Sequence, residues 1–92
     1  MTDDRGLLAA EAYLQAMKRF GVDALYSVSG TDFPSIVEAY GRAGADSSHM
    51  PRPLICPHEN LAVAMAHGHA LVTGRAQAAM VHVSVGTANM VC

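Results

Sequence analysis

The stretch Leu54-Ile55-Cys56-Pro57-His58-Glu59, followed by the apolar segment Leu61 to Val72, decides the fold of this chain. Its first three residues predict a short strand, and the later segment predicts a helix that Gly74 closes. Glu59 therefore stands at a strand-to-helix junction, at the edge where open α/β sheets place their ligands. A carboxylate there is either a proton-handling acid or a favourable charge in the first turn of a helix.

The elements on either side of this stretch alternate between helix and strand. Strands are predicted at Ala24–Val28 and Ala78–Ser84, the second almost continuously apolar, which suits a parallel strand covered on both faces. We therefore predict an α/β fold in three layers, a parallel sheet flanked by helices. The first helix has its apolar stripe at Leu7, Ala10, Leu14 and Met17, extended by Phe20, and the second has its buried side at Phe33, Ile36, Val37 and Tyr40.

Polar turns follow all three predicted strands, at Ser29–Asp32, His58–Glu59 and Ser84–Asn89. Because the carboxyl ends of parallel strands meet at one edge of a sheet, these turns are expected to converge. His82, near the end of the third predicted strand, could point into the same cleft. This convergence predicts a ligand site without naming the ligand.

Each of these residues also has a purely structural interpretation. Gly30 and Gly86 could supply positive backbone angles in tight turns. Thr31 could cap a helix, and Asn89 could hold a turn through local hydrogen bonds. His82 within an apolar strand could be a core histidine.

Composition excludes several classes of function. The 92 residues are 51% hydrophobic and carry a net charge of −2, which gives no basic surface for nucleic acid. No segment reads as a secretory signal or a membrane span, and neither the histidines nor the two cysteines form a metal-binding motif. We expect a cytoplasmic protein. Its apolar composition suggests a fragment of a longer polypeptide, or a piece that completes its core against other chains.

Three motifs resemble the thiamine diphosphate enzymes of the acetolactate synthase, benzoylformate decarboxylase and pyruvate decarboxylase group. Pro57 to Ala70 is similar to their H-E-x-x-A-x-x-x-A-D-G-Y-A block. Phe20 to Thr31 is similar to G-V-x-x-V-F-G-x-P-G. His82 to Asn89 resembles the H-S-A-A-G-T-G-N of benzoylformate decarboxylase and the S-G-P-G-A-T-N of acetolactate synthases. The order and spacing agree over nearly the whole chain.

The resemblance implies the amino-terminal part of a pyrimidine-binding domain, residues 1–92, incomplete as it stands. Glu59 falls on the catalytic glutamate, which hydrogen-bonds N1′ of the aminopyrimidine so that N4′ can deprotonate the thiazolium C2. His82 falls on a proton-transferring histidine, and Thr31 on a substrate-side position. The implied cofactor contacts are at Gly30, Thr31, Glu59, Gly86, Thr87 and Asn89.

The sequence also departs from the family pattern. His67 and His69 replace the Asp and Tyr of A-D-G-Y, and Ser29 replaces the Pro of the P-G turn. The Gly-Asp-Gly motif that carries Mg²⁺ and the diphosphate in the family is absent from this chain. The resemblance therefore implies Mg²⁺ ligands outside these residues, a site completed in a homodimer or homotetramer, and an isolated chain that is inactive.

We predict a part of an acetolactate synthase-like enzyme that decarboxylates or ligates 2-oxo acids. A non-catalytic binding or assembly module that retains the pyrimidine-domain fold is the main alternative. A generic nucleotide-binding α/β domain is a third, and the missing phosphate loop counts against it.

Overall fold

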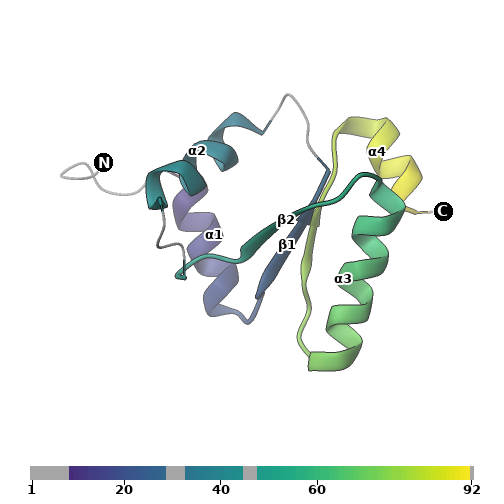
Figure 1. The fold of residues 1–92 in the computed structure, drawn as a ribbon, viewed down its shortest axis with the longest axis horizontal. Coiled ribbons are helices and arrows are strands. Elements are labelled where there is room, and N and C mark those ends of the chain that lie inside the picture. The colour runs from purple at the N-terminus through teal and green to yellow at the C-terminus, as the bar shows by residue number, and fades with distance from the viewer. Residues whose placement is uncertain (1–8, 29–32, 45–47, 92) are drawn as a thin grey trace.

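A computed structural model of the protein describes residues 9–28, 33–44 and 48–91. Within these residues, three strands form one parallel sheet in the order β2-β1-β3. Figure 1 shows α1 and α2 on one side of this sheet and α3 and α4 on the other, which confirms the predicted three-layer α/β fold. In chain order the elements are α1 (Ala9–Arg19), β1 (Ala24–Ser27), α2 (Pro34–Ala43), β2 (Arg52–Ile55), α3 (Glu59–Thr73), β3 (Ala78–Met80) and α4 (Val83–Met90).

The central strand β1 supplies residues to two separate cores. Ala24 and Tyr26 pack with Ala62 and Ala66 of α3, whereas Leu25 packs with Leu14 of α1. Successive side chains of a strand point to opposite faces of its sheet, so this alternation follows from the strand geometry. All four residues of β1 are buried, as expected for a strand covered on both sides.

The edge strand β2 starts earlier than the sequence predicts. It spans Arg52–Ile55 rather than Leu54–Cys56, and it includes Pro53. Proline is tolerated on an edge strand because the N–H that it lacks is not needed on the open side of the sheet. Cys56 still continues the pairing, since its N–H donates to the Ser27 carbonyl at 2.8 Å.

Two apolar residues that we predicted to be buried are exposed. Phe20 is 88% exposed, because α1 ends at Arg19 and the chain turns at Gly21, whose φ of 98° favours glycine. Val37 is 67% exposed, and Ala39 takes the fully buried position of α2 instead. The buried side of α2 is thus narrower than its apolar pattern suggests.

Polar contacts fix α2 to its surroundings. The Tyr40 hydroxyl donates to the Pro51 carbonyl at 2.6 Å, and burial raises the pKa of Tyr40 to about 12. Arg42 forms an ion pair with Glu11 of α1 at 3.1 Å (Nε to Oε2). The largely buried Glu11 carboxylate is thereby paired with a charge, as burial of an ionised group requires.

At the amino-terminal edge of the sheet, side chains from the segment before β3 hold the start of β1. Gln77 Oε1 accepts hydrogen bonds from the N–H groups of Asp23 and Ala24 at 2.8 and 2.9 Å. The Asp23 carboxylate pairs with Arg75 and, at 3.3 Å, with Lys18. The Arg75 hydrogen bond is the main reason that the pKa of Asp23 lies below its ordinary value. These contacts lie at the amino-terminal edge of the sheet. The predicted site residues lie at the opposite, carboxyl-terminal edge.

Candidate functional site

The amino termini of three helices gather at the carboxyl-terminal edge of the sheet. Glu59 begins α3 after β2, Val83 begins α4 after β3, and Phe33 precedes α2 on the chain that leaves β1. Strand β1 leads to α2 on one face of the sheet, whereas the neighbouring β3 leads to α4 on the other. This divergence is a topological switch point, the place where open α/β sheets bind ligands.

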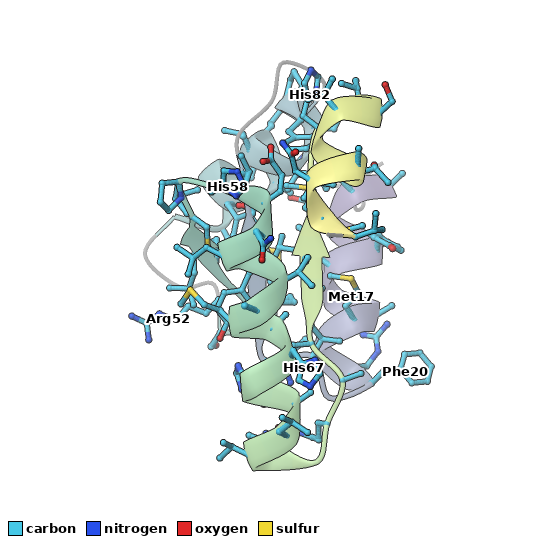
Figure 2. The ribbon with its side chains drawn as sticks, turned by 90° about the vertical axis from the view of Figure 1, so that its right-hand side faces the viewer. Met17, Phe20, Arg52, His58, His67 and His82 are labelled. Atoms are coloured by element: carbon cyan, nitrogen blue, oxygen red, sulfur yellow. The ribbon has the colours of Figure 1, made fainter. Side chains whose placement is uncertain are left out.

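The structure places Glu59 in the first turn of α3, half-buried. The preceding residue, His58, has an extended backbone and caps the helix, because its Nδ1 accepts from the Asn60 N–H at 3.1 Å. His58 is therefore a capping residue, and its exposed side chain lies near the upper end of α3 in Figure 2. The helix terminus does not use the Glu59 carboxylate as its cap, so that carboxylate is available for other contacts.

Helix α4 brings Asn89 and Gly86 to the Glu59 carboxylate. Asn89 Nδ2 donates to Glu59 Oε1 at 3.4 Å, joining residues thirty positions apart. Gly86 is buried on the same side of α4. A Cβ at position 86 would lie 3.4 Å from Glu59 Oε2 and 3.3 Å from Val81 Cβ. The missing side chain is therefore what allows α4 to approach the carboxylate so closely.

Gly86 does not have the role that its turn-like sequence suggests. We predicted a polar turn over Ser84–Asn89, in which Gly86 could supply a positive backbone angle, but these residues are helical and belong to α4. The left-handed conformation falls instead on Val83, with φ of 47°. The chain therefore changes direction at Val83, and α4 begins there, three residues before Gly86.

Strand β3 is shorter than predicted, and His82 lies outside it. The strand ends at Met80 because its partner β1 ends at Ser27, which is paired with Met80. Only one further bond continues the ladder, from the Val28 N–H to the Met80 carbonyl. Beyond this point residues 81–85, of which three are valines, have no strand in the described part of the chain to pair with, and the chain turns into α4.

His82 is the N-cap residue of α4 and is half-buried. Its ring meets the Phe33 ring edge to face, with centroids 6.1 Å apart and planes at 89°. Figure 2 shows His82 at the upper end of the molecule, the end at which His58 also lies. Because Phe33 and His82 follow β1 and β3, this ring pair spans the switch point. The sequence identified His82 but not its partner, since Phe33 reads as an ordinary buried residue of α2.

The remaining predicted site residues have different outcomes. The Thr87 hydroxyl donates to the Val83 carbonyl at 2.9 Å, within α4, and the residue is exposed. Gly30 and Thr31 lie outside the described residues. The structure thus brings together Glu59, Gly86 and Asn89, and it places His82 at the same edge.

The residues around Glu59 are compatible with an aminopyrimidine ring. One carboxyl oxygen is held by the Asn89 amide, and the other faces the space that a side chain at Gly86 would occupy. A half-buried carboxyl group that is oriented by an amide suits a ring nitrogen with which it can share a proton. Among the residues that the structure describes, no group of three or more His, Cys, Asp or Glu could hold a metal ion. No helix of the described part is long and apolar enough to cross a membrane.

The fold and this edge define a class of protein, a three-layer α/β domain with a half-buried carboxylate at the switch point of a parallel sheet. The chain belongs to the family described as thiamine pyrophosphate enzyme, N-terminal TPP binding domain, whose model matches residues 8–92. Neither a search of curated proteins nor a search of solved structures returned a match. Family membership confirms the resemblance seen in the sequence and implies thiamine diphosphate as the cofactor.

Proposed function

We propose that this chain supplies the pyrimidine-binding side of the active site in an acetolactate synthase-like enzyme, which decarboxylates or ligates 2-oxo acids. The observation that supports this proposal is the arrangement of Glu59, Asn89 and Gly86, in which the amide orients the carboxyl group and the glycine leaves space beside it. The resemblance of the motif around Glu59 to the family block supports it independently.

When bound, thiamine diphosphate supplies a thiazolium carbon that becomes a nucleophile once its proton is removed. Glu59 would hydrogen-bond the ring nitrogen of the aminopyrimidine and share a proton with it. Asn89 holds one Glu59 oxygen, which would leave the other oxygen for the ring nitrogen. The Gly86 position lies beside Glu59 Oε2, since a Cβ there would be 3.4 Å from that oxygen.

The substrate side of the proposed site involves His82 and Thr31. The His82 imidazole, which contacts the Phe33 ring, is a group that can donate and accept a proton. Thr31 can donate a hydrogen bond to a substrate carboxylate but is too weak an acid or base to transfer protons itself. We expect the diphosphate and Mg²⁺ to be bound by a Gly-Asp-Gly motif that is not in this sequence, in a homodimer or homotetramer, and the 92-residue chain alone to be inactive.

Replacement of the Glu59 carboxyl group tests the proposed activation step. In the holoenzyme, Glu59→Gln should slow hydrogen–deuterium exchange at C2 of bound thiamine diphosphate by about 10²-fold or more, because an amide cannot exchange a proton with the ring. Quenched-flow exchange followed by NMR measures this rate. Glu38→Gln is the matched control, since Glu38 is an exposed glutamate of α2, and it should leave the exchange rate unchanged.

The outcome also separates the proposed enzyme from a binding module. Unchanged exchange in Glu59→Gln would remove Glu59 from the mechanism. A wild-type protein that binds thiamine diphosphate without accelerating the exchange would instead be the non-catalytic module that the sequence leaves open.

Replacement of His82 tests the substrate side. We expect His82→Ala to slow turnover of 2-oxo acids by about 10²-fold while thiamine diphosphate binding is retained, because a positioned proton donor is lost. Steady-state kinetics and isothermal titration calorimetry measure the two quantities. His49→Ala, at an exposed loop position, is the control. Normal turnover in His82→Ala would leave the histidine with a structural role as the ring partner of Phe33.

A further inference from the structure

A cavity of about 100 Å³ lies between α2 and the carboxyl-terminal half of the sheet. It is on the face of the sheet that α1 and α2 cover, opposite the face that α3 covers (Figure 1). Its floor includes the last residue of each strand, Ser27, Ile55 and Met80, and Ser27 is paired with both of the others. Because serine is smaller than either neighbour in this row, the floor is hollow at its centre.

Helix α2 and the residue before it form the roof of the cavity. Phe33, Ile36 and Val37 line it at a spacing of i, i+3 and i+4, which places them on one side of the helix. Val37 is 67% exposed and Ile55 is 73% exposed, so the cavity is open to solvent along this rim. The unexpected exposure of Val37 is therefore a feature of the cavity. We call the space between this roof and the strand ends the α2 cavity.

The α2 cavity adjoins the proposed substrate side of the site. The Phe33 ring lines the cavity and also meets the His82 ring, with centroids 6.1 Å apart. Met80, on the floor, lies two residues before His82, and Ile55 ends the strand that leads to Glu59. Ligands of open α/β sheets bind at the carboxyl ends of the strands, which is where the cavity and these side chains lie. A molecule bound beside His82 therefore has the α2 cavity next to it.

The lining of the α2 cavity selects an uncharged aliphatic group. None of the described residues that line it is charged, and the Tyr40 hydroxyl is engaged with the Pro51 carbonyl. A carboxylate or phosphate inside would lose its hydration without gaining a partner. An apolar cavity of about 150 Å³ holds benzene, so the smaller α2 cavity suits a branched chain of roughly three or four carbon atoms.

We propose that the α2 cavity binds the branched alkyl side chain of a 2-oxo acid substrate and thereby sets the substrate preference of the enzyme. This inference rests on the proposed function, because it places the oxo and carboxylate groups of that substrate outside the cavity, beside His82. The isobutyl group of 4-methyl-2-oxopentanoate has the required size, whereas the methyl group of pyruvate leaves most of the cavity empty. One methylene in an apolar pocket changes kcat/KM by about tenfold or more.

Steady-state kinetics of the holoenzyme with these two acids test the proposal. In the wild type we expect kcat/KM for 4-methyl-2-oxopentanoate to exceed that for pyruvate by about tenfold or more. Ser27→Leu places an isobutyl group in the cavity from its floor, so the ratio of the two kcat/KM values should fall by about tenfold or more. Ser35→Leu is the matched control, because Ser35 is an exposed residue of α2 that does not line the cavity, and it should leave the ratio unchanged.

Methyl NMR of the holoenzyme separates this proposal from the proposed function, because it reports binding without turnover. The Met80 methyl signal, assigned with Met80→Leu, should shift on addition of 4-methyl-2-oxopentanoate and not on addition of pyruvate. A holoenzyme that turns over pyruvate but shows neither the preference nor the Met80 shift would overturn the α2 cavity as a binding site and leave the proposed function intact. If neither acid is turned over, the proposed function is wrong, and the presence or absence of the Met80 shift then supports or overturns the cavity.

A second variant keeps the test decisive if Ser27→Leu does not fold, which circular dichroism establishes. Val37→Phe adds a ring at the exposed rim, where it narrows the α2 cavity without entering the closed core. We expect it to lower the ratio of the two kcat/KM values by about tenfold. An unchanged ratio in a folded Val37→Phe variant would contradict the proposal.

Discussion

The two helical layers are built in opposite ways on the same sheet. The α1–α2 layer buries a large residue, Leu14, and is held by polar contacts, the Glu11–Arg42 ion pair and the Tyr40 hydroxyl. The α3–α4 layer buries alanines and a glycine, and its large apolar residues lie outside. Small residues let a helix backbone approach its neighbours closely. The α1–α2 layer therefore buries larger side chains, whereas the small residues of the α3–α4 layer allow α4 to approach Glu59 closely.

The largest effect on stability is expected from Leu14, which is 1% exposed in the core of the α1–α2 layer. Leu14→Ala should lower the free energy of unfolding by about 2–5 kcal/mol, because it removes buried methyl groups and leaves a cavity. Urea titration followed by circular dichroism measures this change. Phe20→Ala is the control, since Phe20 is 88% exposed and its loss should cost no more than about 0.5 kcal/mol. Similar costs for the two variants would mean that Phe20 is buried as the sequence pattern predicts.

A smaller effect distinguishes the two layers through their helical glycines. Gly41→Ala in α2 should raise the free energy of unfolding by about 0.5–1 kcal/mol, because alanine favours a helix and its Cβ would meet nothing within 4 Å. The same change at Gly86 of α4 presses a methyl group against Val81 and the Glu59 carboxylate. We expect this crowding to cancel the gain in the free energy of unfolding that alanine brings to a helix. We also expect thiamine diphosphate binding to weaken. If both substitutions stabilise the protein equally and thiamine diphosphate binding is unchanged, the close approach of α4 to Glu59 does not depend on a glycine at position 86.

The smallest effect concerns the pH dependence of the Asp23–Arg75 ion pair at the amino-terminal edge of the sheet. The Arg75 hydrogen bond lowers the pKa of Asp23 in the folded state below its ordinary value of 3.8. This contribution to stability is therefore present above pH 3.8 and is lost as the pH falls through the lower, folded-state pKa. Arg75→Ala should move the Asp23 pKa up toward its ordinary value, which NMR titration of the side-chain carboxyl carbon measures. Arg19→Ala, which removes an exposed arginine at the end of α1, should leave it unchanged.

The alternation of helices and strands could be predicted from the sequence because it depends on local periodicity and on turn residues. The stretch around Glu59 shows this, since the strand, the junction and the helix closed by Gly74 all lie within a single window. The third strand could not be predicted in full. The apolar run through residues 81–85 favours a strand locally, but a strand needs a partner, and β1 ends opposite Met80.

The candidate site divides in the same way. The sequence by itself determined the parallel α/β architecture, the place of Glu59 at a strand-to-helix junction and the family, because these are properties of short segments and their order. Only the tertiary structure decided that α4 starts at Val83, that Asn89 reaches Glu59 across Gly86, and that Phe33 meets His82 across the switch point. These contacts join residues that are distant in the chain, so they depend on the sheet order and on how closely two helices can approach, which no local pattern encodes.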